Sequence, residues 1–263
     1  MCNRPTKAYF ISDLHLGARY LSDPREAECR VVRFLDSIAA DATHLFLLGD
    51  ILDYWYEYRS VVPRGYVRFF AALARLADAG VQLTWMTGNH DVWLFDYLRD
   101  EIGLTVAHEP IVVNLAGRTL FMSHGDDVGK IPFRYRFMKA CFTSRVCQTL
   151  YAAVHPRWTM AVATGWSTSN RTHRKPEVTQ QMAAQNAAAV TEFATAHHQQ
   201  HPEVWAYVFG HLHIADVREI DPDCHILWLG DWINKFTYAV LDEHGMSLRK
   251  WNESDAPTEI SKF

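Results

Sequence analysis

The sequence has few cysteines and no long uninterrupted hydrophobic segment. Its five cysteines are odd in number and include no Cys-x-x-Cys pair, which argues against a disulfide framework and against a thiolate zinc site. No apolar run approaches the length of a membrane span, and the first residues lack the apolar stretch of a signal peptide. Apolar residues still make up 49% of the 263 positions, which is enough for a full core. We therefore predict a folded, cytoplasmic protein with free thiols.

Acidic residues are absent from one long segment. Between Val128 and Pro176 there is no Asp or Glu, and large apolar residues recur there at helical spacing. This pattern predicts a basic helical insertion, over about residues 128–175, that contacts an anionic surface or substrate. The alternatives are a solvated helix face and a buried cap whose apolar residues fill a core. The nine basic residues of the segment are Lys130, Arg134, Arg136, Lys139, Arg145, Arg157, Arg171, Arg174 and Lys175.

Outside that segment, the hydrophobic pattern alternates between strands and helices. Strands are expected at 8–12, 44–48 and 81–86, separated by helices at 24–40 and 64–79, with Gly80 as a C-cap. Further helices are expected at 93–101, 134–154, 160–167 and 177–198, and further strands at 105–107, 111–115, 118–122, 204–209, 215–220, 225–229 and 236–241. The order predicts one α/β domain (of α+β type) over 1–251, a two-sheet sandwich with the insertion as a cap, and a loose tail over 252–263.

Five short polar motifs lie in order along the chain, four of them directly after a predicted strand. They offer Asp, Asn and His side chains and no thiolate, a set that suits two adjacent hard or borderline divalent metals. Two such ions can lower the pKa of a water and hold a phosphoryl group in line for attack. The motifs are Asp13-Leu14-His15, Gly49-Asp50, Gly88-Asn89-His90-Asp91, Ser123-His124-Gly125-Asp126 and Gly210-His211-Leu212-His213.

Each motif has a structural interpretation when it is taken alone. A strand-end Asp, a turn Asn or a surface His is common without any ligand. Within two motifs, however, the polar residues are two apart on an extended segment and so point the same way, as in Asp13 with His15. The number and the order of the motifs together favour a metallophosphoesterase.

The same motifs resemble those of the calcineurin-like metallophosphoesterases over residues 13–213. The resemblance implies one metal held by Asp13, His15, Asp50 and His213, and a second held by Asp50, Asn89, His124 and His211, with manganese as the expected ion. It further implies that His90 is the catalytic histidine and that Asp53 orients it.

Within the family, the segments 12–17, 49–55 and 123–126 and the basic insertion are most similar to the branch that hydrolyses UDP-2,3-diacylglucosamine in lipid A biosynthesis. That resemblance implies a lipid-linked UDP-sugar substrate, UMP and 2,3-diacylglucosamine 1-phosphate as products, and a location on the cytoplasmic side, peripheral to the anionic inner membrane. Expected substrate contacts are Asn89, His90, Arg134, Tyr135 and His211. The alternatives are a phosphoesterase for another ester, such as a nucleotide, a phosphoprotein or, less favoured, a nucleic acid, and a non-catalytic scaffold on the same fold.

Overall fold

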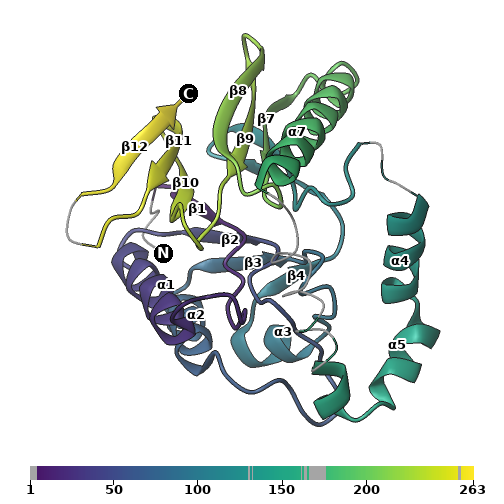
Figure 1. Cartoon of the computed structure of the whole chain (residues 1–263). Coiled ribbons are helices and arrows are strands. Elements are labelled where there is room, and N and C mark those ends of the chain that lie inside the picture. Colours follow the sequence, from purple (N-terminus) through teal and green to yellow (C-terminus); the bar gives the residue numbers. More distant parts are fainter. Residues whose placement is uncertain are drawn as a thin grey trace.

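Two β-sheets lie face to face in the computed structural model, which describes residues 5–129, 131, 133–160, 162, 165, 176–253 and 256–263 (Figure 1). This arrangement confirms the predicted two-sheet sandwich. One sheet has seven strands in the order β12 (Thr258–Lys262), β11 (Gly245–Lys250), β10 (Thr237–Asp242), β1 (Ala8–Ile11), β2 (His44–Leu48), β3 (Gln82–Met86) and β4 (Thr105–Ala107). The other has five strands in the order β5 (Ile111–Leu115), β6 (Arg118–Ser123), β7 (Val204–Phe209), β9 (Cys224–Leu229) and β8 (Ala215–Asp221).

Helices cover the two outer faces of the sandwich (Figure 1). Helices α1 (Pro24–Ile38) and α2 (Val67–Asp78) pack on the seven-stranded sheet, and α7 (Pro176–His198) packs on the five-stranded sheet. Strand β1 shows how the sequence achieves this, because successive side chains of a strand point to opposite faces. Tyr9 and Ile11 join the core under α1 and α2, whereas Ala8 and Phe10 join the core between the sheets.

The ends of the early helices follow from local chemistry. The carboxylate of Asp23 accepts a hydrogen bond from the Glu26 backbone N–H (2.9 Å), and Pro24 occupies the first turn of α1. After α2, Gly80 has a φ of +87° and donates its N–H to the Ala77 carbonyl, as its predicted capping role requires.

The short helix expected at 93–101 is instead α3 (Tyr97–Ile102). Glu57 is buried, and its Oε2 accepts hydrogen bonds from the backbone N–H groups of Phe95, Asp96 and Tyr97. The first N–H groups of a helix have no acceptor within the helix, and here the Glu57 carboxylate accepts them. The helix therefore begins at Tyr97. Trp93 lies outside the helix and pairs with Tyr56 in an isolated β-bridge.

The prediction of a loose tail over 252–263 is wrong for its last residues. Residues Thr258–Lys262 form β12, which pairs antiparallel with β11 at the edge of the seven-stranded sheet. Phe263 exchanges two backbone hydrogen bonds with Met246. The polar composition concealed this strand, because an edge strand needs no buried face of its own.

The basic insertion forms a cap of two helices, α4 (Phe133–Thr143) and α5 (Arg145–Ala152), to one side of the sandwich (Figure 1). The continuous helix expected at 134–154 is broken at Ser144, whose backbone is extended (φ −69°, ψ 121°). Residues 156–160 are again helical, and most of the helix expected at 160–167 lies outside the described residues. No helix in the described part of the chain is long and apolar enough to cross a membrane.

An aromatic cluster joins the cap to the body. Tyr54, Tyr56 and Trp93 are buried there, and Phe142, Tyr151 and Met160 of the insertion pack against them. The Tyr56 hydroxyl donates to the Gln148 carbonyl (2.7 Å), and the Trp93 indole N–H donates to the Phe142 carbonyl (3.0 Å). The cap is therefore held in place by both apolar contact and directed hydrogen bonds.

Candidate metal centre

The five motifs meet at one edge of the sandwich because they follow neighbouring parallel strands. Strands β1, β2 and β3 are parallel neighbours in one sheet, and β6 and β7 are parallel neighbours in the other. The carboxyl ends of parallel strands share an edge of their sheet, so the loops after them converge. The side chains brought together are Asp13, His15, Asp50, His90, His124, His211 and His213, and Asn89 lies next to His90 in the chain with its Oδ1 buried.

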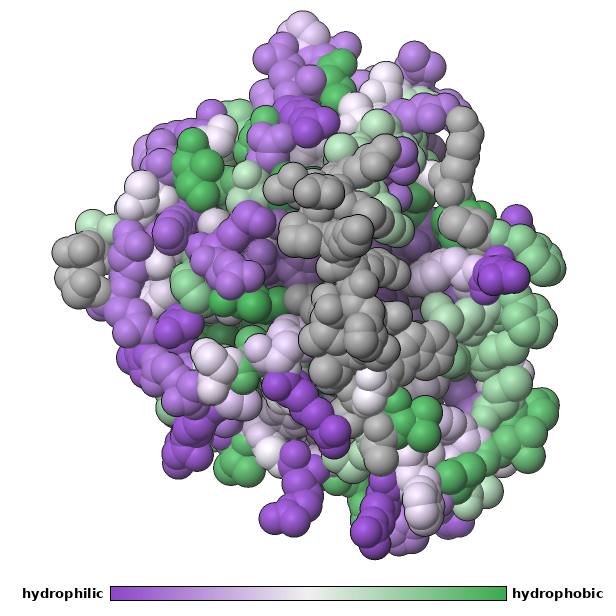
Figure 2. Space-filling view, viewed as in Figure 1, coloured by the Kyte–Doolittle hydropathy of each residue, from purple (hydrophilic) through white to green (hydrophobic). Residues whose placement is uncertain are grey.

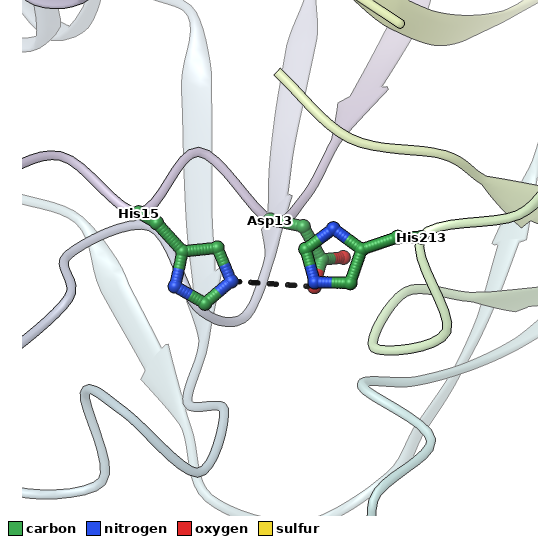
Figure 3. Close-up of side chains that lie close together, drawn as sticks. All are labelled: Asp13, His15 and His213. Carbon is green, nitrogen blue, oxygen red and sulfur yellow. Dashed lines mark ion pairs between the residues drawn. The ribbon is translucent and has the colours of Figure 1, made fainter. Parts of the chain in front are cut away.

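The first cluster consists of Asp13, His15 and His213, whose ligand atoms all lie within 4.8 Å of one another (Figure 3). The Asp13 Oδ1 atom is 3.9 Å from His15 Nε2 and 3.5 Å from His213 Nε2. His15 Nε2 is also 3.7 Å from Asp50 Oδ2. The four side chains that the sequence assigned to the first metal are thus neighbours.

The second cluster consists of Asp50, His124 and His211. Asp50 Oδ2 lies 3.4 Å from His124 Nε2, while Asp50 Oδ1 accepts the backbone N–H of His90 (2.9 Å). The same Oδ2 atom faces His15 of the first cluster, so one carboxylate lies between the two groups. This position is the one that a bridging ligand needs.

A third group, formed by His15, Asp53 and His90, lies beside the first. His90 Nδ1 is 3.0 Å from the Asp53 backbone carbonyl and 3.4 Å from Asp53 Oδ1. Burial lowers the pKa of His90, but the charges of Asp50 and Asp53 outweigh it and raise the pKa to about 9. Asp53 Oδ1 is equally close to His15 Nδ1 (3.4 Å), so Asp53 orients both histidines.

The backbone at this edge is left-handed at five of the predicted ligands. Only glycine adopts such φ values without cost, and a non-glycine residue there costs on the order of 1–3 kcal/mol. Several such residues in one place mark a site where the surrounding structure imposes a functional geometry. The φ values are +53° at Asp13, +45° at His15, +52° at Asp50, +65° at His211 and +53° at His213.

Four of the candidate ligand atoms are buried without a hydrogen-bond partner in the described part of the chain. They are Asp13 Oδ1, Asn89 Oδ1, His124 Nε2 and His211 Nδ1. A buried polar atom without a partner costs about 1–3 kcal/mol, so a cluster of them in a native fold calls for a ligand. All four are oxygen or nitrogen atoms of the kinds that bind divalent metals, so the site fits two such ions.

The pKa shifts of Asp13 and His211 favour the forms of these two side chains that bind a metal. Burial raises the pKa of Asp13, but the charge of His213 and the neighbouring His15 imidazole outweigh it and lower the pKa to about 2. Burial and the nearby His124 lower the pKa of His211 to about 4. At neutral pH the carboxylate is therefore ionised and this imidazole is neutral, which are the forms that coordinate a metal.

Three motif glycines are required because ligand side chains lie against them. A Cβ on Gly49 would lie 2.4 Å from His124 Nδ1, and a Cβ on Gly210 would lie 2.8 Å from Asp13 Oδ2. At Gly88, a Cβ would lie 2.3 Å from Asp50 Oδ1 and 2.5 Å from the Asp50 backbone nitrogen. The glycines thus allow the loops to approach as closely as the clusters require.

We expect Gly88→Ala to displace Asp50 and to disrupt the site more than the fold. Overpacking of this kind costs about 1–3 kcal/mol of unfolding free energy, which a folded domain tolerates. Metal content by elemental analysis should fall clearly, while urea unfolding should show only that modest loss. Gly165→Ala is the matched control, because no atom of the residues that the structure describes lies within 4 Å of its Cβ position. Wild-type metal content in Gly88→Ala would contradict the close packing.

Asp91 belongs to the motif Gly88-Asn89-His90-Asp91, but the sequence alone indicated no role for it. In the structure it holds two of the motif loops together. It is fully buried, and its carboxylate accepts hydrogen bonds from the backbone N–H groups of Gly88 (2.7 Å), Ile51 (2.9 Å) and Asp50 (3.3 Å). The indole N–H of Trp85 donates to it as well (3.2 Å). Asp91 thereby fixes the Asp50 loop against the Asn89 loop.

Asp231 was missed altogether. Its Oδ2 lies 3.7 Å from His213 Nδ1, and its Oδ1 accepts the backbone N–H groups of Ile233, Asn234 and Lys235. A carboxylate behind a ligand histidine fixes which ring nitrogen faces the metal, here Nε2. The available signal was Gly230-Asp231 after a strand, the same pattern as Gly49-Asp50.

A cavity of about 320 Å³ runs from Gly88 and Asn89 to the cap. Tyr135 lines it and donates its hydroxyl hydrogen bond to Asp126 (2.6 Å), and Lys139 pairs with Asp126 and Asp127. Its walls include the apolar side chains of Val92, Phe95, Met138 and Phe142.

The basic residues of the insertion differ in their exposure and in their contacts. Arg134, which was expected to contact substrate, is exposed and is not among the residues that line this cavity, whereas Arg145 is. Lys139 faces acidic partners rather than solvent. Lys130, Arg171, Arg174 and Lys175 lie outside the described residues.

Comparisons with known proteins agree with this geometry. The profile described as calcineurin-like phosphoesterase matches residues 6–215. The chain is 40% identical to the UDP-2,3-diacylglucosamine hydrolase of Porphyromonas gingivalis, over 90% of this chain and 94% of that protein. It is 28% identical to the protein of the same name from Nitrosococcus oceani, over 85% of this chain and 86% of that protein.

Proposed function

Because the chain belongs to the calcineurin-like phosphoesterase family, we propose that it hydrolyses the pyrophosphate of UDP-2,3-diacylglucosamine, a step of lipid A biosynthesis. The products would be UMP and 2,3-diacylglucosamine 1-phosphate. The observation that carries the chemistry is the group of four buried candidate ligand atoms without hydrogen-bond partners in the described part of the chain, near the Asp50 carboxylate that faces both clusters. The names of relatives that align over most of the chain support the choice of substrate.

The proposed ligands are those suggested by the sequence. Asp13, His15, Asp50 and His213 would hold one divalent ion, and Asp50, Asn89, His124 and His211 would hold the other. When bound, such a pair supplies a water of lowered pKa and polarises the phosphate. We propose manganese because of the resemblance to the family, and the oxygen and nitrogen donors, with no thiolate, fit a divalent ion of this kind.

His90 would act on the phosphate. Its Nδ1 atom is engaged by Asp53, which leaves Nε2 as the atom that can donate a hydrogen bond or a proton to a phosphate or leaving-group oxygen. Asp53 is 5% exposed and contacts His15 as well, so it keeps both rings in place. His90 itself is 22% exposed at its side chain, as a residue that meets substrate must be.

The substrate assignment is tested by comparing acylated with unacylated substrate. The apolar cavity wall beside Asn89 would bury acyl carbons, and each buried CH₂ contributes about 0.8 kcal/mol. We expect kcat/KM for UDP-2,3-diacylglucosamine to exceed that for the unacylated UDP-sugar by at least about 100-fold, measured as UMP released. Equal rates with the two substrates would show that another phosphate ester is the natural substrate.

The cap also supports a peripheral position at the anionic inner membrane, on the cytoplasmic side. Figure 2 shows hydrophobic side chains gathered along the right-hand edge of the molecule, over α4 and α5. An apolar surface bordered by cations can enter the headgroup region of a leaflet. The exposed apolar residues are Phe133, Phe137, Val146, Leu150, Val154 and Trp158, and the exposed cations beside them are Arg134, Arg136, Arg145 and Arg157.

We expect charge reversal on the cap to release the protein from anionic vesicles. Each cation near an anionic leaflet adds about 1 kcal/mol, so Arg134→Glu, Arg136→Glu and Arg145→Glu together should weaken partitioning by at least about 100-fold. Vesicle sedimentation at low salt measures this. The control reverses the same charge at exposed sites on β8, β11 and β12, with Arg218→Glu, Lys250→Glu and Lys262→Glu. If the two triple variants sediment alike, the cap is not the binding surface.

A further inference from the structure

A second cavity, of about 330 Å³, opens beside Asp53. Its size falls in the range of about 300–1,000 Å³ that is usual for small-molecule sites. One wall comes from the loop that carries His15, another from the segment after Asp50, and the others from the first turns of α1, the segment before α2 and the cap. The lining residues used below are Arg25, Glu28, Tyr54, Arg64 and Tyr66.

The two cavities lie against different parts of the candidate site. The first touches Gly88 and Asn89, and the second touches Leu16, Gly17 and Asp53, with no lining residue in common. A pyrophosphate that joins two large groups needs room for one group on each side of the bond that breaks. Two cavities that meet the site at different residues provide that room.

Two arginine side chains line the second cavity. Arg25 and Arg64 are exposed, and neither guanidinium has an ion-pair or hydrogen-bond partner among the residues that the structure describes. Glu28 Oε1 accepts the backbone N–H groups of Arg68 and Phe69. Its Oε2 is the remaining acceptor, and a carboxylate of this kind can receive ribose hydroxyls.

Tyr66 supplies an aromatic wall in a strained conformation. Its φ is +60°, which is an outlier for a bulky residue. A Cβ on Gly17 would lie only 2.1 Å from the Tyr66 hydroxyl oxygen, so this glycine, next to the His15 loop, is what allows the tyrosine to sit there. Strain of this kind is found where function fixes a side chain.

We propose that this second cavity binds the uridine half of the substrate, an inference that rests on the proposed function. Arg25 and Arg64 would contact the carbonyl or phosphate oxygens of the nucleotide, which guanidinium groups recognise well. Tyr66 would lie against the pyrimidine, and Glu28 would accept from the ribose. The diacylated sugar then occupies the first cavity, beside Asn89 and Phe142.

The test is direct binding of each product to the metal-loaded protein by calorimetry, using UMP and 2,3-diacylglucosamine 1-phosphate as separate probes. For the double variant Arg25→Ala, Arg64→Ala, we expect the Kd of UMP to rise at least about tenfold and that of the lipid phosphate to change by less than about twofold. Arg145→Ala, which alters the first cavity, is the matched control and should show the reverse pattern.

The outcomes separate this proposal from the function on which it rests. No UMP binding by the wild type, or an unchanged UMP Kd in the double variant, overturns the uridine site. Weakened lipid binding in the double variant, with UMP unaffected, also overturns it and reverses the substrate's direction. If the wild type fails to hydrolyse the diacylated UDP-sugar while the double variant still loses UMP affinity, the nucleotide cavity stands and the proposed function fails.

Discussion

Replacing Asp50 with alanine is expected to abolish hydrolysis and to lower metal occupancy at both clusters. The Asp50 carboxylate faces His15 of one cluster and His124 of the other. Two metal ions contribute several kcal/mol of transition-state stabilisation, and each 1.36 kcal/mol is a factor of ten in rate. We therefore expect a loss of at least about 1,000-fold in kcat/KM, with elemental analysis showing two metals per chain in the wild type and fewer than one in the variant.

Two further variants show whether charge or shape is responsible. Asp50→Asn keeps an oxygen for the backbone N–H of His90 but removes the charge, so it should also lose metal. Asp78→Ala removes an exposed carboxylate on α2 and should behave as wild type. A full complement of metal in Asp50→Ala, or loss from one cluster alone, would rule out the bridging position.

Replacing His90 with alanine is expected to slow hydrolysis by about 100- to 10,000-fold while both metals remain bound. That range is typical of general acid–base assistance. The contact that His90 makes with Asp50 comes from its backbone N–H, which alanine retains, so the metal clusters should persist. The measurements are kcat with the diacylated UDP-sugar and metal content by elemental analysis. His244→Ala, at an exposed histidine on the surface, is the control.

The variant Asp53→Asn is expected to differ from His90→Ala in its metal content. Because its carboxylate contacts His15 as well as His90, Asp53→Asn should reduce both the rate and the metal content. Added imidazole should restore part of the rate in His90→Ala and none of the metal content in Asp53→Asn. Full activity in His90→Ala, or loss of metal in that variant, would remove His90 from the catalytic role proposed for it.

The cap illustrates why a composition pattern leaves alternatives open. The sequence predicted a basic, apolar-rich helical insertion and could not separate a membrane-facing surface from a buried cap. In the structure, packed and exposed apolar residues occur within the same segment, because Phe142, Tyr151 and Met160 pack against the aromatic cluster while Phe137, Leu150 and Trp158 are exposed. The break at Ser144 turns the two helices so that each has its own inner and outer side.

The sequence by itself determined the chemistry of this protein's candidate site and most of the order of its elements. The types of the candidate ligands and their spacing are local properties, since a glycine, an aspartate and a histidine after a strand can be recognised within a few residues. The apolar runs of the early strands and their alternation with helices likewise indicated a two-sheet α/β sandwich, which the structure confirms. The edge strand β12 escaped because it has no such pattern.

Only the tertiary structure decided which side chains meet and what holds them. Asp91 accepts the backbone N–H groups of Asp50 and Ile51 from a separate loop, and Asp231 faces His213 from a separate loop, so both contacts depend on how the loops converge. The left-handed conformations at five candidate ligands and the second cavity beside Asp53 are likewise decided by the tertiary structure. A sequence specifies donors and spacings, but distances between loops on separate strands are set by the packing of the two sheets.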